Sequence, residues 1–225
     1  MIKDVFGKRL GMVISGIIGT AIGCGLLKFA DLGIDPFNAL VTGMANLSHM
    51  QYGMICMIVT GVFMVVTLIF DKYYIGIATI FSLFLFGYMV EYTLVLLNII
   101  LPNTSMLIRV ITLMLGLIII SASSSLYFTA NMGVSTYDAM SLIAADKSPI
   151  PFRICRIISD VICVIIGFVF NATIGIGTII TAFFLGPAID FFNKSLAKPL
   201  LYGKCSCETT NHLNKDMKQN RRRII

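Results

Sequence analysis

Four polar residues at equivalent places in two short segments are the strongest candidates for chemistry in this sequence. They are Asp35, Asn38, Ser135 and Asp138, and each lies at or just inside the predicted start of a short helix. The first turn of a helix leaves backbone N–H groups unpaired, so side-chain oxygens gathered there can join them in binding a polar or anionic group. We therefore predict that these four residues bind a substrate.

Two acidic residues within long apolar stretches are further candidates for substrate binding. Glu91 lies toward the outer end of the third apolar stretch, and Asp190 lies toward the inner end of the sixth. An ionisable residue inside a membrane helix is costly and commonly marks a functional site. Their opposite placement suits access to a site from both sides of a membrane. The alternative is that both carboxylates simply meet water near helix ends.

Catalytic and metal-binding patterns are missing from the sequence. It contains two histidines, His49 and His212, and neither has a nucleophile or a metal ligand at a suitable spacing. The group formed by Cys205, Cys207 and His212 lacks the four-ligand spacing of a zinc module. No phosphate-binding loop or dinucleotide fingerprint occurs. We therefore expect no enzyme activity, no cofactor and no metal site.

The composition places the candidate residues in an all-α polytopic membrane protein. The chain has 225 residues, of which 57% are hydrophobic and 12% are charged, whereas soluble domains are about a quarter charged. A membrane-spanning helix needs about 20 apolar residues. Six stretches meet this need, at residues 10–30, 54–70, 75–101, 106–130, 154–170 and 174–192. Two leftover segments, 35–50 and 135–149, are too short and too polar to span.

Each leftover segment begins with the signals of a helix stop followed by a helix start. Gly33 can take the left-handed conformation that ends a helix, Asp35 is a good N-cap, and Pro36 suits the first helical position. In the second segment Ser135 is the expected cap, and Asp138 can close an arrangement like a capping box. Each short helix either re-enters the protein, with its N-terminus at a binding site, or lies at the membrane interface with its first residues only capping it.

The distribution of basic residues predicts the orientation in the membrane. Short loops that carry Lys and Arg stay in the cytoplasm, and a cytoplasmic N-terminus puts most such residues on that side: Lys3, Lys8, Arg9, Lys72, Lys147, Arg153 and Arg156. Both termini then lie in the cytoplasm, at a bacterial plasma membrane. The basic tail at 196–225 is predicted to be disordered. The formal net charge of the whole chain is +6, and its basic tail indicates a lipid surface as partner and no nucleic acid.

An internal repeat relates the two halves of a single membrane domain, residues 1–195. A shift of 100 positions places Arg9 on Arg109, Gly33 on Gly133 and Ala39 on Ala139. After a gap of one residue, Glu91 falls on Asp190. Repeat 1 covers about 9–101 and repeat 2 about 109–195. Each repeat has three spans, and an odd number means that the second repeat is inverted relative to the first.

Three features of the sequence resemble the YczE/YitT-type family of bacterial integral membrane proteins. They are the segment Gly-Ile-Asp-Pro-Phe-Asn-Ala-Leu at 33–40, its echo at 133–140 and the layout of six spans. The resemblance covers roughly residues 8–195 and leaves out the tail. It implies an integral membrane protein, but it carries no substrate or reaction.

An inverted repeat is a recurring plan of transporters and channels, with the solute site where the repeats meet. We therefore expect a secondary transporter or channel for a small solute, whose identity the sequence does not give. Two alternatives stay open. One is a substrate-binding subunit that works with a partner membrane subunit, and the other is a membrane scaffold or regulator that transports nothing. Assembly into a homo-oligomer is also left open.

Overall fold

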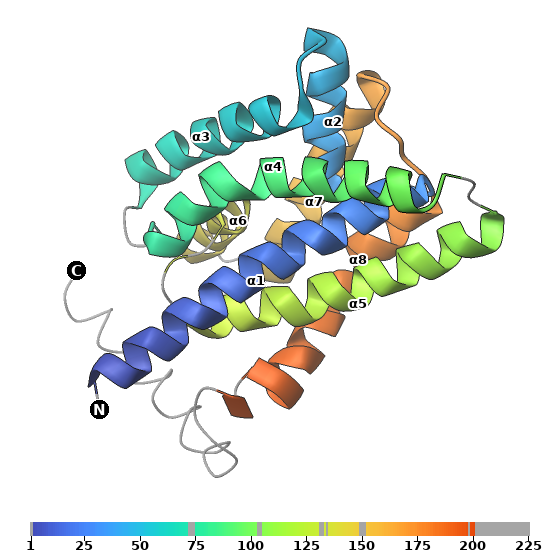
Figure 1. Ribbon diagram of the computed structural model, residues 1–225. Helices are drawn as coiled ribbons and strands as arrows, with labels where there is room; N and C mark the ends of the chain where they lie inside the picture. The colour runs from blue at the N-terminus through green and yellow to red at the C-terminus, as the bar shows by residue number, and fades with distance from the viewer. Residues whose placement is uncertain are drawn as a thin grey trace.

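The computed structural model is helical throughout the part of the chain that it describes, which is residues 2–71, 75–102, 105–130, 133, 135–148, 152–197 and 199–200 (Figure 1). Eight α-helices follow one another in these residues: α1 Ile2–Ala30, α2 Pro36–Ser48, α3 Tyr52–Phe70, α4 Ile77–Ile100, α5 Met106–Ala130, α6 Thr136–Lys147, α7 Phe152–Val169 and α8 Ile176–Phe192. A π-helical turn, Asn193–Ala197, continues α8. Nearly all of the predicted tail lies outside the described residues.

Five helical stretches are long and apolar enough to cross a membrane: Gly7–Ala30, Tyr52–Phe70, Thr79–Ile100, Met106–Ala130 and Ile176–Ala197. They coincide with five of the six predicted spans. The remaining prediction falls on α7, whose 18 residues include three charged ones, Arg153, Arg156 and Asp160. By length and composition, the described part of the chain is therefore a multi-pass membrane protein with about five spans, and the six-span prediction is confirmed only to that extent.

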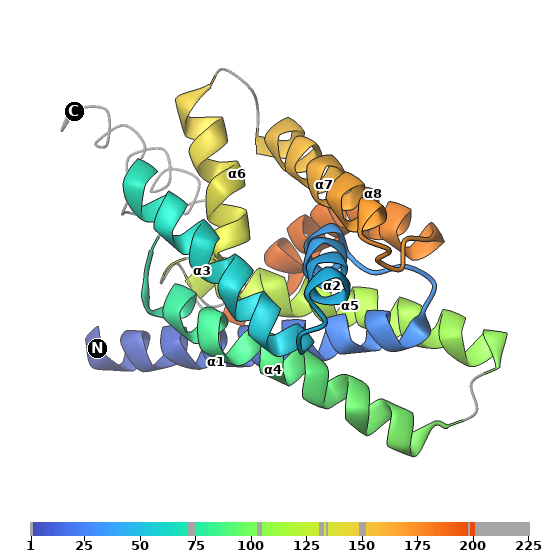
Figure 2. The same cartoon turned by 90° about the horizontal axis from the view of Figure 1, so that it is seen from above.

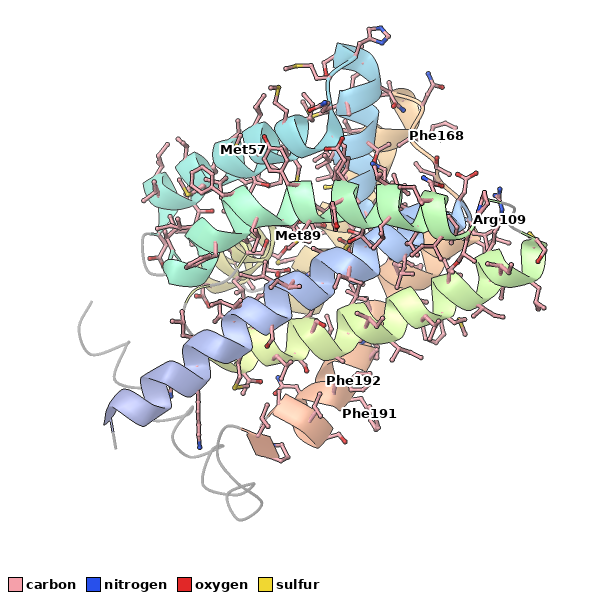
Figure 3. The ribbon with its side chains drawn as sticks, viewed as in Figure 1. Met57, Met89, Arg109, Phe168, Phe191 and Phe192 are labelled. Atoms are coloured by element: carbon pink, nitrogen blue, oxygen red, sulfur yellow. The ribbon has the colours of Figure 1, made fainter. Side chains whose placement is uncertain are left out.

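Large apolar side chains cover the outside of the helices, as expected of a surface that meets lipid. Phe168 of α7 and Phe191 of α8 are 71% and 65% exposed and point away from the other helices (Figure 3). Ile99 of α4 and Leu107 of α5 are exposed to a similar degree. A soluble monomer rarely presents so much contiguous apolar surface to water, whereas a bilayer accepts it.

Helices α1 and α5 pack tightly against each other and run antiparallel (Figure 1). A Cβ atom added to Gly16 would lie 2.9 Å from the backbone oxygen of Ser123, whereas one added to Gly23 would lie 3.0 Å from that of Gly116. Position 16 therefore meets the later part of α5, and position 23 meets the earlier part. Small residues at these crossings let the two backbones approach closely.

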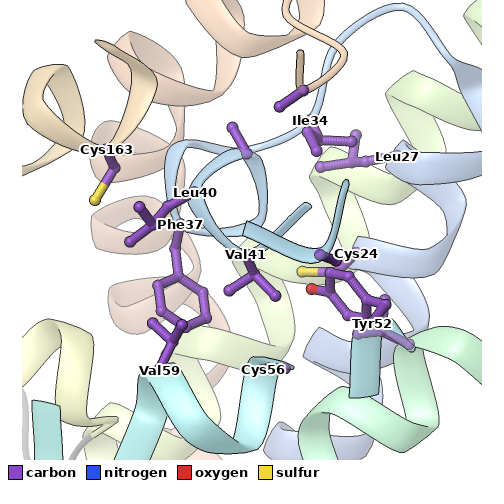
Figure 4. Close-up of a cluster of buried hydrophobic side chains, with 14 of the residues drawn as sticks. Cys24, Leu27, Ile34, Phe37, Leu40, Val41, Tyr52, Cys56, Val59 and Cys163 are labelled. Atoms are coloured by element: carbon purple, nitrogen blue, oxygen red, sulfur yellow. The ribbon is translucent and has the colours of Figure 1, made fainter. Parts of the chain in front are cut away.

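The two short helices begin inside the protein. Helix α2 packs against α7, and α6 packs against α3 (Figure 2). Phe37 and Val41 of α2 belong to the main apolar core, which also includes Leu27 of α1 and Val59 of α3 (Figure 4). The first six residues of α2 are all buried. Burial at this level distinguishes these helices from ones that lie with a single face on a membrane interface.

Candidate functional site

Helix α2 starts with the predicted cap. Asp35 has an extended backbone, and its side chain accepts a hydrogen bond of 3.3 Å from the backbone N–H of Asn38. Pro36 occupies the first helical position, where its missing N–H leaves no partner unpaired. Gly33 precedes the cap with φ +117°, a left-handed conformation that disfavours other residues. The prediction for this helix start is confirmed.

The start of α6 differs from the prediction. Ser135 is the N-cap residue, but its side chain makes no capping hydrogen bond. The carboxylate of Asp138 instead accepts hydrogen bonds from the hydroxyl of Tyr127 and the guanidinium of Arg156. The predicted arrangement like a capping box is therefore wrong, because a buried guanidinium is a stronger partner for the carboxylate than a backbone amide.

A first polar network extends from the start of α2. The side-chain amide of Asn38 donates to Asp35, and the hydroxyl of Tyr52 in turn donates to the side-chain oxygen of Asn38. The thiol of Cys24 in α1 lies 3.8 Å from a carboxylate oxygen of Asp35 and donates to it. Asn38 is 2% exposed, so this network is held from behind by buried groups of α2 and α3.

A second polar network extends from the start of α6. Arg156 of α7 donates to Asp138, and its Nε lies 3.8 Å from the carboxylate of Asp160 one turn later. The hydroxyl of Tyr137 donates to Asp160, and the guanidinium of Arg156 lies 5.1 Å from the centre of the Tyr137 ring. Charges buried in a protein need partners of this kind. The guanidinium is therefore shared between two carboxylates.

Both networks line one partly open cavity of about 100 Å³. Asp35 and Phe37 reach it from the start of α2, and Ser135, Tyr137 and Asp138 reach it from the start of α6. Side chains of the other six helices complete its walls, among them Cys24, Thr60, Ser82, Ser124, Arg156, Asp160 and Leu185. This volume is several times what one water molecule needs, so the space suits several waters or one small solute.

Acidic groups outnumber basic groups at this cavity. Asp35, Asp138 and Asp160 line it together with a single basic residue, Arg156. Arg156 is already engaged by Asp138 and Asp160, and Asp35 has no ion-pair partner among the described residues. Burial raises the pKa of the Asp35 carboxyl above its ordinary value, although the hydrogen bonds from Asn38 and the positive charge of Arg156 oppose the change.

The structure brings three of the six predicted site residues to the cavity wall: Asp35, Ser135 and Asp138. Asn38 lies behind Asp35 as its hydrogen-bond partner. Glu91 does not line the cavity; it accepts a hydrogen bond of 3.2 Å from the backbone N–H of Gly53 at the start of α3. The side chain of Asp190 lies outside what the structure describes. Substrate binding by any of the six stays a prediction.

Sequence reasoning missed four charged or aromatic residues of the second polar network, namely Tyr127, Tyr137, Arg156 and Asp160. Arg156 was placed with the cytoplasmic basic residues, but its side chain faces the cavity from α7. A basic and an acidic residue one turn apart within an apolar stretch, Arg156 and Asp160, were the available signal for a site. In the described residues, no group of three or more His, Cys, Asp or Glu side chains could hold a metal ion.

Comparison with known proteins gives a family but no activity. Residues 7–194 match a family model with the description "Family of unknown function (DUF6198)". This range contains α1 from Gly7 onward, all of α2 to α8, and every residue of the two polar networks. No curated protein and no solved structure matches the chain.

Proposed function

The chain belongs to the family of unknown function DUF6198. We propose that it is a secondary transporter or channel for a small solute, rather than an enzyme. Its solute site is the cavity between the starts of α2 and α6. The observation that carries the proposal is the cavity itself, which charged and hydroxyl side chains line within a membrane protein. Such groups are costly inside a membrane and commonly mark the path of a solute.

Reciprocal contacts support an inverted repeat as the plan of this transporter. An added Cβ at Gly16 would lie against Tyr127, and one at Gly116 would lie against Leu27, the residue 100 positions before Tyr127. Because α1 and α5 run antiparallel, a two-fold axis that relates them would lie across the helices, in the plane of the membrane. Repeats related by such an axis bind solutes where they meet.

The glycines that precede the short helices repeat this pattern. An added Cβ at Gly33 would lie 2.8 Å from the Oγ1 of Thr178 at the start of α8, and one at Gly133 would lie 3.1 Å from the Oγ1 of Thr79 at the start of α4. Thr79 and Thr178 are equivalent in the repeat. Each half therefore places its glycine on the other half's last helix, which supports one joint membrane domain over residues 1–195.

Helix α7 completes six spans in this proposal. Its 18 residues give a length of about 27 Å, close to the thickness of the hydrocarbon core. Arg156 and Asp160 face the cavity, while the exposed side chains that the structure describes from Ile154 onward in α7 are apolar, including Ile158, Val161 and Ile165. Six spans put both termini on the cytoplasmic side of a bacterial plasma membrane, and they agree with the resemblance to the YczE/YitT-type family.

Flux through purified protein in liposomes tests the proposal. Full-length chain should pass at least one small solute from a panel of cations, anions, zwitterions and neutral compounds. Ser124→Leu, which fills the cavity from α5, should abolish that flux. Ser105→Leu, the same change at the exposed residue before α5, should leave it intact. Flux that survives Ser124→Leu would place the path elsewhere. Solute binding without flux would favour the substrate-binding subunit. The absence of both binding and flux would favour the scaffold or regulator.

A further inference from the structure

We propose that the solute is a small organic cation, an amine whose ammonium group binds the Asp35 carboxylate among the aromatic rings of the cavity, a deduction that rests on the function proposed above. The cavity of about 100 Å³ is smaller than an engineered apolar cavity of about 150 Å³ that accepts benzene, so it fits roughly four to five non-hydrogen atoms. The ligand is therefore an amine near the size of tetramethylammonium or smaller.

The charges at the cavity favour a cation. Three carboxylates and one guanidinium line it, so the formal charge is −2 when all four groups are ionised. Arg156 is shared by Asp138 and Asp160, so it offers little to an incoming anion. Lys28 lies over the ring of Tyr52, 3.5 Å from its centre, and does not line the cavity. An anionic solute would therefore meet carboxylates without a free cation to balance it.

Asp35 is the carboxylate at the cavity that has no ion-pair partner among the described residues. It accepts hydrogen bonds from the amide and backbone of Asn38 and from the thiol of Cys24, all of them neutral donors. A carboxylate has about four acceptor sites, so at least one is left for a solute. Asp35 is partly buried, and a carboxylate largely removed from water without an ion-pair partner is unfavourable. A cationic solute would supply that counter-ion, whereas a neutral solute would not.

Aromatic rings form much of the remaining wall: Phe37, Phe86, Tyr127, Phe128 and Tyr137. The ring centres of Phe37 and Tyr137 lie 5.2 Å apart, one from each half of the chain. Aromatic faces attract ammonium groups and form the cages that recognise quaternary ammonium ligands. The hydroxyls of Tyr127 and Tyr137 are engaged by Asp138 and Asp160. The Tyr137 ring already faces the guanidinium of Arg156, 5.1 Å from its centre, so the other rings of the wall are left to contact a cationic solute.

The starts of α2 and α6 point to the opposite charge, since helix N-termini favour anions. Here, however, each of these helix starts already has a carboxylate of the protein. Asp35 accepts from a backbone N–H of the first turn of α2, and Asp138 lies within the first turn of α6. The positive ends of the two helices are thus compensated internally, and the charge available to a solute stays negative.

Calorimetry on the full chain in lipid nanodiscs tests the inference with defined probes. Tetramethylammonium has no N–H to donate, so its charge and the aromatic faces alone would hold it. It should bind at least about 30-fold more tightly than tert-butanol, a neutral analogue of similar shape, as expected of a desolvated contact between a cation and aromatic rings. Acetate, an anion of four non-hydrogen atoms that the cavity could also hold, should not bind detectably. Equal binding of the cation and the alcohol, or preferred binding of the anion, would overturn the inference, as would binding of neither tetramethylammonium nor methylammonium.

Asp35→Asn assigns any observed binding to this carboxylate. Asparagine is as good an N-cap as aspartate, so the helix start should persist while the charge is lost. The cation preference should disappear in this variant and survive in Asp31→Asn, which alters an exposed acid paired with Arg109 outside the cavity. Unchanged cation binding in folded Asp35→Asn would refute the assignment. If Asp35→Asn does not fold, Phe37→Leu should weaken cation binding about 2- to 30-fold, and no change would count against the site.

The result separates this inference from the proposed function. Flux of a neutral or anionic solute that Ser124→Leu blocks, together with no binding of either cation, would reject the organic cation and keep the transporter. Cation binding with no flux of any solute would keep the site and reject the transporter.

Discussion

Replacement of Arg156 by Gln should destabilise the protein far more than the same change at Arg109. Arg156 donates to Asp138, whose side chain is 6% exposed, and lies 3.8 Å from Asp160, whose side chain is 8% exposed. Its removal leaves two nearly buried carboxylates without a counter-ion. Breaking a buried ion pair from one side costs about 3–5 kcal/mol. Arg109 and Asp31 are 34% and 56% exposed, and a pair of that kind contributes about 0–1 kcal/mol.

The assay is reversible unfolding in mixed micelles, from which the free energy of unfolding is obtained for each variant. Asp138→Asn gives an internal scale: Arg156 keeps Asp160 as a counter-ion, so only a charge-assisted hydrogen bond of about 1.5–3 kcal/mol is at risk. The expected order of destabilisation is Arg156→Gln, then Asp138→Asn, then Arg109→Gln. If Arg156→Gln costs no more than Arg109→Gln, the second polar network does not hold the cavity wall as described.

Three further predictions concern the backbone, the pH dependence and the topology. Gly33→Ala should destabilise the fold by about 1–2 kcal/mol or more, because Gly33 has φ +117° and an added Cβ would lie 2.8 Å from the Gly175 nitrogen. The control is Gly11→Ala in α1, where an added Cβ would meet no neighbouring atom. This change should be neutral or stabilising in the same unfolding assay. Burial raises the pKa of Asp35, so its protonated form stabilises the fold at low pH, and this contribution is lost as pH rises through the raised pKa. Thermal unfolding from about pH 4 to about pH 8 should therefore show the wild type losing stability relative to Asp35→Asn. A stability difference that stays constant over this pH range would contradict the prediction. Reporter fusions should place both termini in the cytoplasm if α7 spans, whereas termini on opposite sides would leave five spans.

The long helices and the α2 cap could be predicted because both depend on nearby residues. Apolar length alone locates five spans, and Asp35 followed by Pro36 is a local signal for a helix start. The partners of Asp138 could not be predicted in this way. Tyr127 and Arg156 lie 11 and 18 residues away along the chain. Only the packing of α5, α6 and α7 brings the three side chains together.

The position of Arg156 shows the same limit. In the sequence, a charge near the beginning of an apolar stretch is typical of a loop, and basic residues near a loop favour the cytoplasm. In the structure Asp138 and Asp160 compensate the guanidinium, so it can lie inside the protein. Periodicity shows which face of a helix is polar, but it does not show which other helix supplies the counter-charge.

The central claim is that the cavity belongs to a solute path that opens to both sides of the membrane. Cys24 is a suitable reporter, because it lines the cavity and is 4% exposed. A variant with Cys24 as its sole cysteine can be treated with silver ion, a small thiol-reactive cation within the size that the cavity holds, added to one side of oriented proteoliposomes at a time. We predict modification from either side, slowed by tetramethylammonium. A thiol that reacts from neither side, or from one side only, would contradict a two-sided path through this cavity.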